Sequence, residues 1–183
     1  MNHFSSFLIL LIAFVGVFMQ SSFDALRNLS GAQIDILPAL IIYTALTHDL
    51  VSMSLLGVLG GLWTDSLSAN ALGASVLPLS LIGLITYQSR SLLLRENTYA
   101  QFVLGASASA LVPLCTVVTL LGLGDHPIIG WGSLWQLLVM AAAGGVLTPL
   151  CFLVFDRINL ALNYRPATEN SFRQDRQIKR GRQ

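Results

Sequence analysis

The chain has 183 residues, of which 54% are hydrophobic and only 10% are charged. A soluble domain carries about 25% charged residues, so this composition excludes a water-soluble domain and predicts a membrane protein. The formal net charge of +1 gives no global electrostatic argument for a nucleic-acid partner, and we expect none.

Six apolar segments predict an all-α, polytopic membrane protein with six transmembrane helices. The first segment has no lysine or arginine before it and no small-residue cleavage site after it, so we expect it to be retained as a membrane helix. The second and third are shorter than the roughly 20 residues that cross a bilayer, and we expect a tight hairpin buried against the other helices. The expected spans are residues 4–20, 34–46, 50–64, 71–87, 99–123 and 133–155.

Single residues refine these expected helices. Asp35 is expected to cap the second segment, and Pro38 falls in its first turn, where proline is tolerated. Pro78, Pro113 and Pro149 fall inside the last three segments. Interior prolines remove a backbone hydrogen bond, so we expect kinks in those three helices.

Lysine and arginine are unevenly placed along the chain. Nine of the ten follow the fourth or the sixth segment, and Arg27 is alone between the first and second. With six spans these two regions share one side of the membrane, which the positive-inside rule makes cytoplasmic. Residues 1–164 are then the membrane domain, with both termini cytoplasmic, and residues 165–183 are a disordered basic tail. The tail is expected either to anchor the topology with a weak attraction to anionic lipid or to bind a cytoplasmic partner. The basic residues on this side are Arg90, Arg95, Arg157, Arg165, Arg173, Arg176, Lys179, Arg180 and Arg182.

The connection between the third and fourth segments carries the most specific pattern. Gly57, Gly60 and Gly61 are three and four residues apart, so they share a helix face on which a second helix can approach closely. Trp63 is expected at the level of the lipid headgroups. Asp65 closes this helix, faces the outside and is expected to cap the segment after it. Packing inside the protein and contact with a partner remain alternatives for this face.

No arrangement of catalytic or metal-binding residues stands out. The sequence has no H-E-x-x-H, no G-x-S-x-G and no glycine-rich phosphate loop. His48 and Asp49 form a polar turn with no second ligand at metal spacing. Ser107 and Ser109 lie in a run of small residues, which is more typical of a helix-packing face than of a nucleophile. The two cysteines lie in apolar runs. We therefore expect no enzyme activity, no metal and no cofactor.

The third and fourth segments also carry a family resemblance. The pattern G-x-x-x-G-L-x-x-D at residues 57–65, followed by Leu72 and Gly73, resembles the bacterial rod shape-determining protein MreD family. The motif D-I-L-P at residues 35–38 resembles the start of that family's second helix more loosely. Chain length, span number and a basic cytoplasmic tail agree with the family, whereas the length of the tail and the loop at residues 125–127 match no family pattern.

The resemblance implies a scaffold role in the bacterial inner membrane. Members of the family associate with MreC, whose large domain is extracytoplasmic. Through MreC they connect indirectly to the MreB filament and to the peptidoglycan synthases that build the lateral wall. The expected role is therefore non-catalytic support of cell elongation, carried out by helix faces and short loops within the lipid bilayer.

The alternative is the substrate-binding subunit of a vitamin or micronutrient transporter, whose six short helices form a similar fold. Such subunits usually carry an A-x-x-x-A stripe on the first helix, whereas this chain has Ala13 and Gly16 there without such a stripe. An intramembrane enzyme is a weaker alternative still. A transporter also needs polar residues that converge on an outer pocket, and the candidates are Asp65, Ser66, Ser68 and Asn70.

Overall fold

The computed structural model describes residues 3–22, 31–68, 71–90, 97–122, 124 and 130–162. Over these residues the regular structure is entirely helical, which confirms the all-α prediction. The described helices are α1 (His3–Ser22), α3 (Leu37–Thr47), α4 (Leu50–Leu67), α5 (Val76–Gln88), α6 (Thr98–Gly122) and α7 (Trp131–Leu162).

The shortest of these helices, α3, is the centre of the fold. All of its residues from Leu37 to Ala45 are buried, and it contacts each of the other five described helices. Tyr43 stacks on Phe155 of α7 with ring centroids 4.7 Å apart and meets Phe152 edge-on at 5.0 Å. A helix that is apolar all round is expected to be enclosed. Here the enclosing material is protein, so α3 is shielded from the surroundings on every side.

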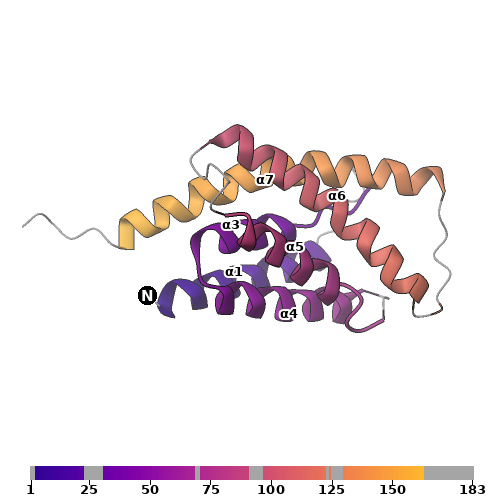
Figure 1. The fold of residues 1–183 in the computed structure, drawn as a ribbon, viewed down its shortest axis with the longest axis horizontal. Helices are drawn as coiled ribbons and strands as arrows, with labels where there is room; N and C mark the ends of the chain where they lie inside the picture. Colours follow the sequence, from indigo (N-terminus) through magenta and orange to yellow (C-terminus); the bar gives the residue numbers. More distant parts are fainter. Residues whose placement is uncertain are drawn as a thin grey trace, which may run out of the picture.

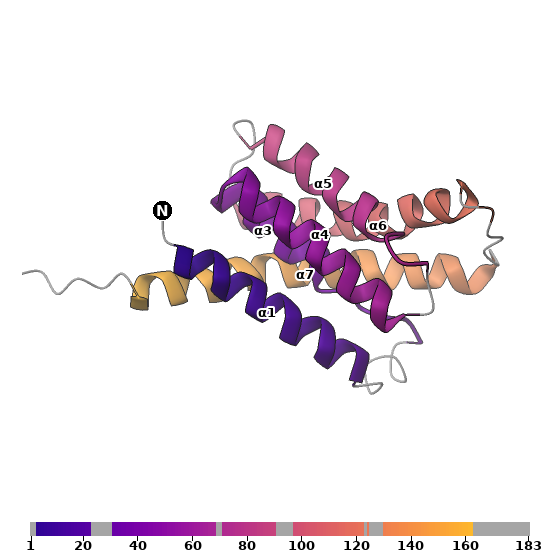
Figure 2. The same ribbon diagram turned by 90° about the horizontal axis from the view of Figure 1, so that it is seen from below.

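The other helices form two groups around α3. The α6–α7 pair lies on one side of α3 and α5, and α1 and α4 lie on the opposite side (Figure 1). Seen from below, α1 and α4 are in front and the α6–α7 pair is behind (Figure 2). The chain thus wraps a single short helix with longer ones.

The two ends of the bundle can be told apart by their residues. The Oε1 atom of Gln20 accepts the Ile36 N–H at 3.3 Å, which places the end of α1 beside the start of α3. Asp35 directly precedes Ile36, and Asp65 lies near the end of α4, which runs beside α1 in the same direction (Figure 2). We call this end of the bundle the Asp65 end. The opposite end, where α5 finishes just before Arg90, is called the Arg90 end.

Three helices, α4, α6 and α7, are long and apolar enough to cross a membrane by length and composition. The apolar stretches of α1, α3 and α5 are shorter. At 1.5 Å per residue, the 11 residues of α3 extend about 16 Å, roughly half of a hydrocarbon core of about 30 Å. A helix this short depends on protein around its ends, in keeping with the burial of its residues from Leu37 to Ala45.

Some helix boundaries differ from the sequence-based ones. Helix α5 begins at Val76 and not at residue 71, so Pro78 lies in its first turn, where it removes no internal hydrogen bond. Pro113 and Pro149 do lie inside helices, as expected. Helix α7 continues past residue 155 to Leu162, because the residues that follow are tolerated in helices and none is a proline or glycine.

Hydroxyl groups inside the bundle bond to their own helices. The hydroxyls of Thr44, Thr86 and Thr148, all buried, donate to the carbonyl oxygen four residues earlier, at 2.7–2.8 Å. The Thr116 hydroxyl does the same to Val112, beside Pro113. This pattern lets polar residues occupy a membrane helix without leaving a donor unpaired.

Candidate functional site

Asp65 is the centre of the most organised polar feature in the described chain. It is the third residue from the end of α4, and only 1% of its surface is exposed. Its Oδ2 atom accepts the Gly73 N–H at 2.9 Å and the Ser75 N–H at 3.1 Å, while Oδ1 lies 3.3 Å from the same Ser75 nitrogen. The carboxylate therefore satisfies amides just before α5, where the positive end of the helix dipole also favours a negative charge.

The segment between the two helices is folded into turns under this carboxylate. Gly73 has φ +95°, a left-handed conformation that glycine adopts without strain. The Ala74 N–H donates to Ala71 and the Val76 N–H to Gly73, both through backbone carbonyls. Asp65 thus caps the following helix from a distance, and this is why α5 starts at Val76 instead of earlier. We call Asp65 together with residues 71–75 the Asp65 turn.

The glycine face of α4 packs inside the protein. A Cβ atom added at Gly61 would lie 2.7 Å from the Val76 Cα, so the backbones of α4 and α5 are in close contact there. At Gly57 an added Cβ would lie 3.0 Å from the Ser80 hydroxyl, and at Gly60 it would lie 3.0 Å from a methyl group of Leu37. The three glycines therefore admit α5 and α3 at short range, as small residues do in membrane proteins.

This packing bears on the two alternatives for the glycine face. Gly57, Gly60 and Gly61 are all buried, with α3 and α5 of the same chain against them. No room is left on this face for a helix of another protein in this conformation. A partner has to bind elsewhere on the surface.

The other residues of the family-like pattern have different positions. Leu72 is 73% exposed at the tip of the Asp65 turn, so it contributes little to packing within the chain. Trp63 is half-buried and meets Phe14 of α1 edge-on, with centroids 5.1 Å apart. Gly73 holds the turn through its backbone conformation. The structure therefore joins Asp65, Gly61 and Gly73 into one unit and leaves Leu72 outside it.

The four polar residues considered for a ligand pocket do not converge. The Asp65 carboxylate is occupied by backbone amides. Ser66 and Ser68 are exposed, and their hydroxyls donate to the carbonyls of Trp63 and Asp65 in the same helix. Asn70 lies outside the described residues. Among the described residues, no group of three or more His, Cys, Asp or Glu side chains is placed to hold a metal ion.

The basic residues of the expected cytoplasmic side are described only in part. Arg90 is exposed, and its guanidinium lies 4.3 Å from the centroid of the Tyr87 ring, within cation–π distance. Arg157 is exposed near the end of α7. The remaining members, Arg95, Arg165, Arg173, Arg176, Lys179, Arg180 and Arg182, lie outside the described residues, as does the whole tail from residue 165.

A second close helix crossing lies between α6 and α7. Gly105 of α6 faces Gly144 and Thr148 of α7, and an added Cβ at either glycine would overlap atoms of the other helix. Ser109, one turn further along α6 than Gly105, also packs on Gly144. The small-residue run in α6 is therefore a packing face, whereas Ser107 is exposed and donates to the Leu104 carbonyl.

Two buried hydroxyls, those of Ser80 and Ser109, have no hydrogen-bond partner among the described residues. Each packs against a glycine of the neighbouring helix, Ser80 against Gly57 and Ser109 against Gly144. Close approach of a hydroxyl oxygen to a glycine Cα is the geometry of weak Cα–H···O contacts at helix interfaces. The sequence pointed to the glycines of α4, but it did not reveal that Gly57 packs against Ser80 or that Gly144 packs against Ser109.

No model of a known protein family, no curated protein and no solved structure matches this chain. Function is therefore inferred from the residues and their geometry.

Replacement of Asp65 should separate its geometric role from its charge. Asp65→Asn keeps an oxygen at the position that accepts both the Gly73 and Ser75 amides, so we expect a loss of about 1 kcal/mol or less in the free energy of unfolding. Asp65→Leu leaves both amides without this acceptor and should cost on the order of 2 kcal/mol or more. Thermal unfolding of the purified protein in detergent measures both. Equal losses for the two variants would contradict the capping role.

Proposed function

We propose that this protein is a non-catalytic component of the bacterial cell-elongation complex, a relative of MreD that supports lateral peptidoglycan synthesis through an MreC-like partner. The observation that carries the proposal is the family-like stretch at residues 57–73. Gly61, Asp65 and Gly73 of this stretch lie together. Gly61 admits the start of α5, and Asp65 holds Gly73 and Ser75 by their amides. A pattern in which separate positions build one rigid turn is more specific than small-residue spacing alone.

The proposal includes six spans in the inner membrane with both termini in the cytoplasm. Three helices have the required length, and α3, the shortest, is enclosed by the rest. Aromatic residues mark the two interfaces, and arginine supports the orientation. The three tryptophans, Trp63, Trp131 and Trp135, are near the end of α4 and the start of α7. Tyr87 lies at the other end of the bundle, in the last turn of α5, and Arg90 follows this helix. Tryptophan and tyrosine concentrate at the two membrane interfaces, and arginine on the cytoplasmic side.

The partner would bind to outward-facing apolar side chains instead of the glycine face. Large apolar residues are exposed along α1, α6 and α7, among them Phe14, Leu114 and Leu150. Single contacts between membrane helices are worth about 1 kcal/mol, so a broad surface has to carry the association. The Asp65 turn would then support the fold at its outer end, and not bind the partner directly.

The topology can be tested by labelling single cysteines from outside the cell. We expect a membrane-impermeant reagent to reach a cysteine at Ser68, which is exposed at the Asp65 end, and to miss one at Gln174 in the basic tail. The native cysteines at positions 115 and 151 are first replaced by alanine. Labelling of Gln174→Cys in intact cells, alone or together with the cysteine at position 68, would contradict the proposed six-span topology.

The partner is tested by purification of the tagged full-length chain from its own membranes in mild detergent. The proposal predicts co-purification of a protein with one N-terminal membrane helix followed by a coiled coil and an extracytoplasmic domain. The Asp65→Asn variant, expected to keep its fold, is the matched sample and should retain the partner. Absence of such a protein from both samples, with a vitamin retained at high affinity, would favour the transporter subunit instead.

A further inference from the structure

Helix α5 lies at the surface of the bundle, where it contacts α4, α6 and the central helix α3. In the view from below it forms one edge of the protein (Figure 2). Its outer side chains are apolar and recur at the spacing of one helix face, so they form a continuous stripe. We call this stripe the α5 face; its members, each 47–65% exposed, are Leu77, Leu81, Leu84 and Ile85.

The α5 face ends at non-helical backbone on one side. The Asp65 turn precedes α5, and its Ala71 and Leu72 are exposed. Irregular backbone exposed to lipid does not occur within the hydrocarbon region, because its polar groups would have no water to bond. The Asp65 turn therefore marks the level at which the hydrocarbon has to end.

A fixed positive charge ends the α5 face on the other side. Gln88 is exposed, and the guanidinium of Arg90 lies 4.3 Å from the centroid of the Tyr87 ring. An arginine at the end of a membrane helix usually extends away from the hydrocarbon and so lengthens the apolar span. Here the side chain is folded back over the last turn of α5, which brings the charge level with the end of the helix.

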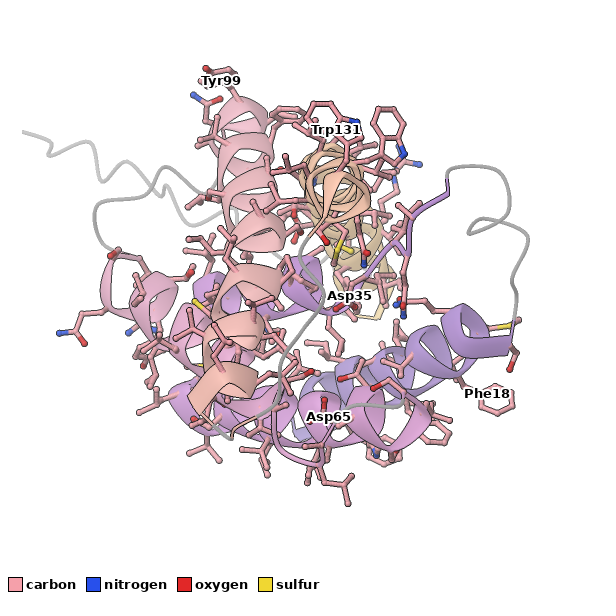
Figure 3. All side chains as sticks on the ribbon, turned by 90° about the vertical axis from the view of Figure 1, so that its right-hand side faces the viewer. Phe18, Asp35, Asp65, Tyr99 and Trp131 are labelled. Carbon is pink, nitrogen blue, oxygen red and sulfur yellow. The ribbon has the colours of Figure 1, made fainter. Side chains whose placement is uncertain are left out.

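The lengths of neighbouring helices differ greatly. At 1.5 Å per residue, the 13 residues of α5 extend about 20 Å, whereas the 25 residues of α6 extend about 37 Å. The hydrocarbon core of a bilayer is about 30 Å thick. Helix α6 has exposed apolar side chains from Phe102 to Leu121. Tyr99 at its start and Phe18 of α1 point away from the bundle (Figure 3). The outer apolar surface is thus short at α5 and long at α6.

Two other ways to accommodate a short apolar face are disfavoured. Tilting shortens the span of a helix further, and α5 is held against α4 at Gly57 and Gly61. A second protein helix is the other possibility. However, the close helix contacts within this chain use glycine and serine, whereas the α5 face consists of leucine and isoleucine alone. Bulky aliphatic side chains without small neighbours suit a surface that meets lipid chains.

We propose that the α5 face binds lipid and thins the bilayer beside it, with a preference for phospholipids with short acyl chains. A bilayer of ordinary thickness would cover the Asp65 turn and Arg90 with hydrocarbon, and thinning avoids this. Beside α6 the same bilayer keeps its ordinary thickness. The inference rests on the proposed six-span topology, in which α5 crosses the membrane, and not on the role in cell elongation.

The test measures which lipids contact each face of the purified full-length protein in phosphatidylcholine vesicles. The three native tryptophans are replaced by phenylalanine, and one tryptophan is introduced by Leu81→Trp on α5 or by Leu111→Trp on α6. Both positions are near the middle of their helix, and their side chains are 51% and 48% exposed. A brominated phosphatidylcholine quenches the fluorescence, and unbrominated lipids with chains of about 14 or about 22 carbons compete with it.

We expect the short-chain lipid to displace the brominated lipid from position 81 at least about threefold more effectively than the long-chain lipid, with no such preference at position 111. Arg90→Leu removes the charge that ends the α5 face and should shift the preference at position 81 towards longer chains. Arg157→Leu is the matched control, because it removes an exposed arginine near the end of α7, and it should leave that preference unchanged.

The same chain-length preference at positions 81 and 111 would overturn the proposal. So would the absence of quenching at position 81, because protein and not lipid would then cover the α5 face. Leu84→Trp, on the same face, repeats the measurement independently. The cysteine labelling described above tests the topology separately, so a failure of the lipid preference can be distinguished from a failure of the six-span arrangement.

Discussion

Replacement of Gly144 by leucine should abolish the folded protein, with little or no monodisperse material recovered in detergent. Gly144 lies where α6 and α7 cross, and a Cβ atom there would overlap the Ser109 side chain and lie 2.9 Å from the Gly105 carbonyl oxygen. A backbone carbonyl cannot rotate away as a side chain can. The helices would have to separate, and Ser109 and Thr148, both buried, would lose their packing.

The expected magnitude follows from the geometry of this crossing. Extra methylene groups in a packed core typically cost about 1–3 kcal/mol, and more where the neighbours cannot move. Here both neighbouring backbones are fixed in long helices, so we expect the loss in the free energy of unfolding to reach or exceed the upper end of this range. Gly132→Leu is the matched control, because it lies in the same helix with nothing within 4 Å of an added Cβ. Wild-type yield and melting temperature for Gly144→Leu would contradict this account of the crossing.

Replacement of Gly61 by leucine should be the second most damaging change. An added Cβ would lie 2.7 Å from the Cα and 2.9 Å from the backbone nitrogen of Val76, so the start of α5 would have to move. That movement would also stretch the bonds from Asp65 to Gly73 and Ser75, and the loss should exceed that of Asp65→Asn. We expect a fall in the free energy of unfolding of about 3 kcal/mol or more.

Gly16→Leu is the comparison for this variant. Its added Cβ would meet only side-chain atoms of Ile36, the nearest at 3.2 Å, and these can shift. Gly60→Ala should also be tolerated better than Gly61→Ala, because the atoms in its way belong to the Leu37 side chain. Chemical or thermal unfolding of the four variants ranks them directly. If Gly61→Leu and Gly16→Leu unfold alike, the glycine face has no special role in joining α4 to α5.

The positions of the helices were predictable because long apolar runs have few other solutions in a chain with so little charge. The burial of α3 was expected from its short length, but its contact with all five of the other described helices was not predictable. Its residues are apolar on every side, and such a pattern is the same for a helix enclosed by lipid and for one enclosed by protein. Only the three-dimensional arrangement distinguishes the two. The short length of the segment was the one indication that it needs shielding.

The polar contacts could also be predicted only in part from the sequence. The capping role of Asp65 could be predicted from its place at the end of an apolar run, but its partners Gly73 and Ser75 are eight and ten residues away. The late start of α5 follows from those distant bonds. The pairing of Gln20 with the segment before α3 spans sixteen residues, and periodicity carries no information about it. The G-x-x-x-S run of α6 and the G-x-x-x-T run of α7 were present in the sequence, yet their pairing also had to come from the fold.

The most direct test of the proposed role is depletion of the protein in its source organism, which the proposal takes to be a rod-shaped bacterium, while cell shape is followed by microscopy. The account predicts that rods widen and round into spheres, with insertion of new peptidoglycan lost from the lateral wall. Re-expression of the wild type or of Asp65→Asn should restore rods, and Gly144→Leu should not. Rods that keep their width and their lateral-wall synthesis after complete depletion would contradict a role in cell elongation.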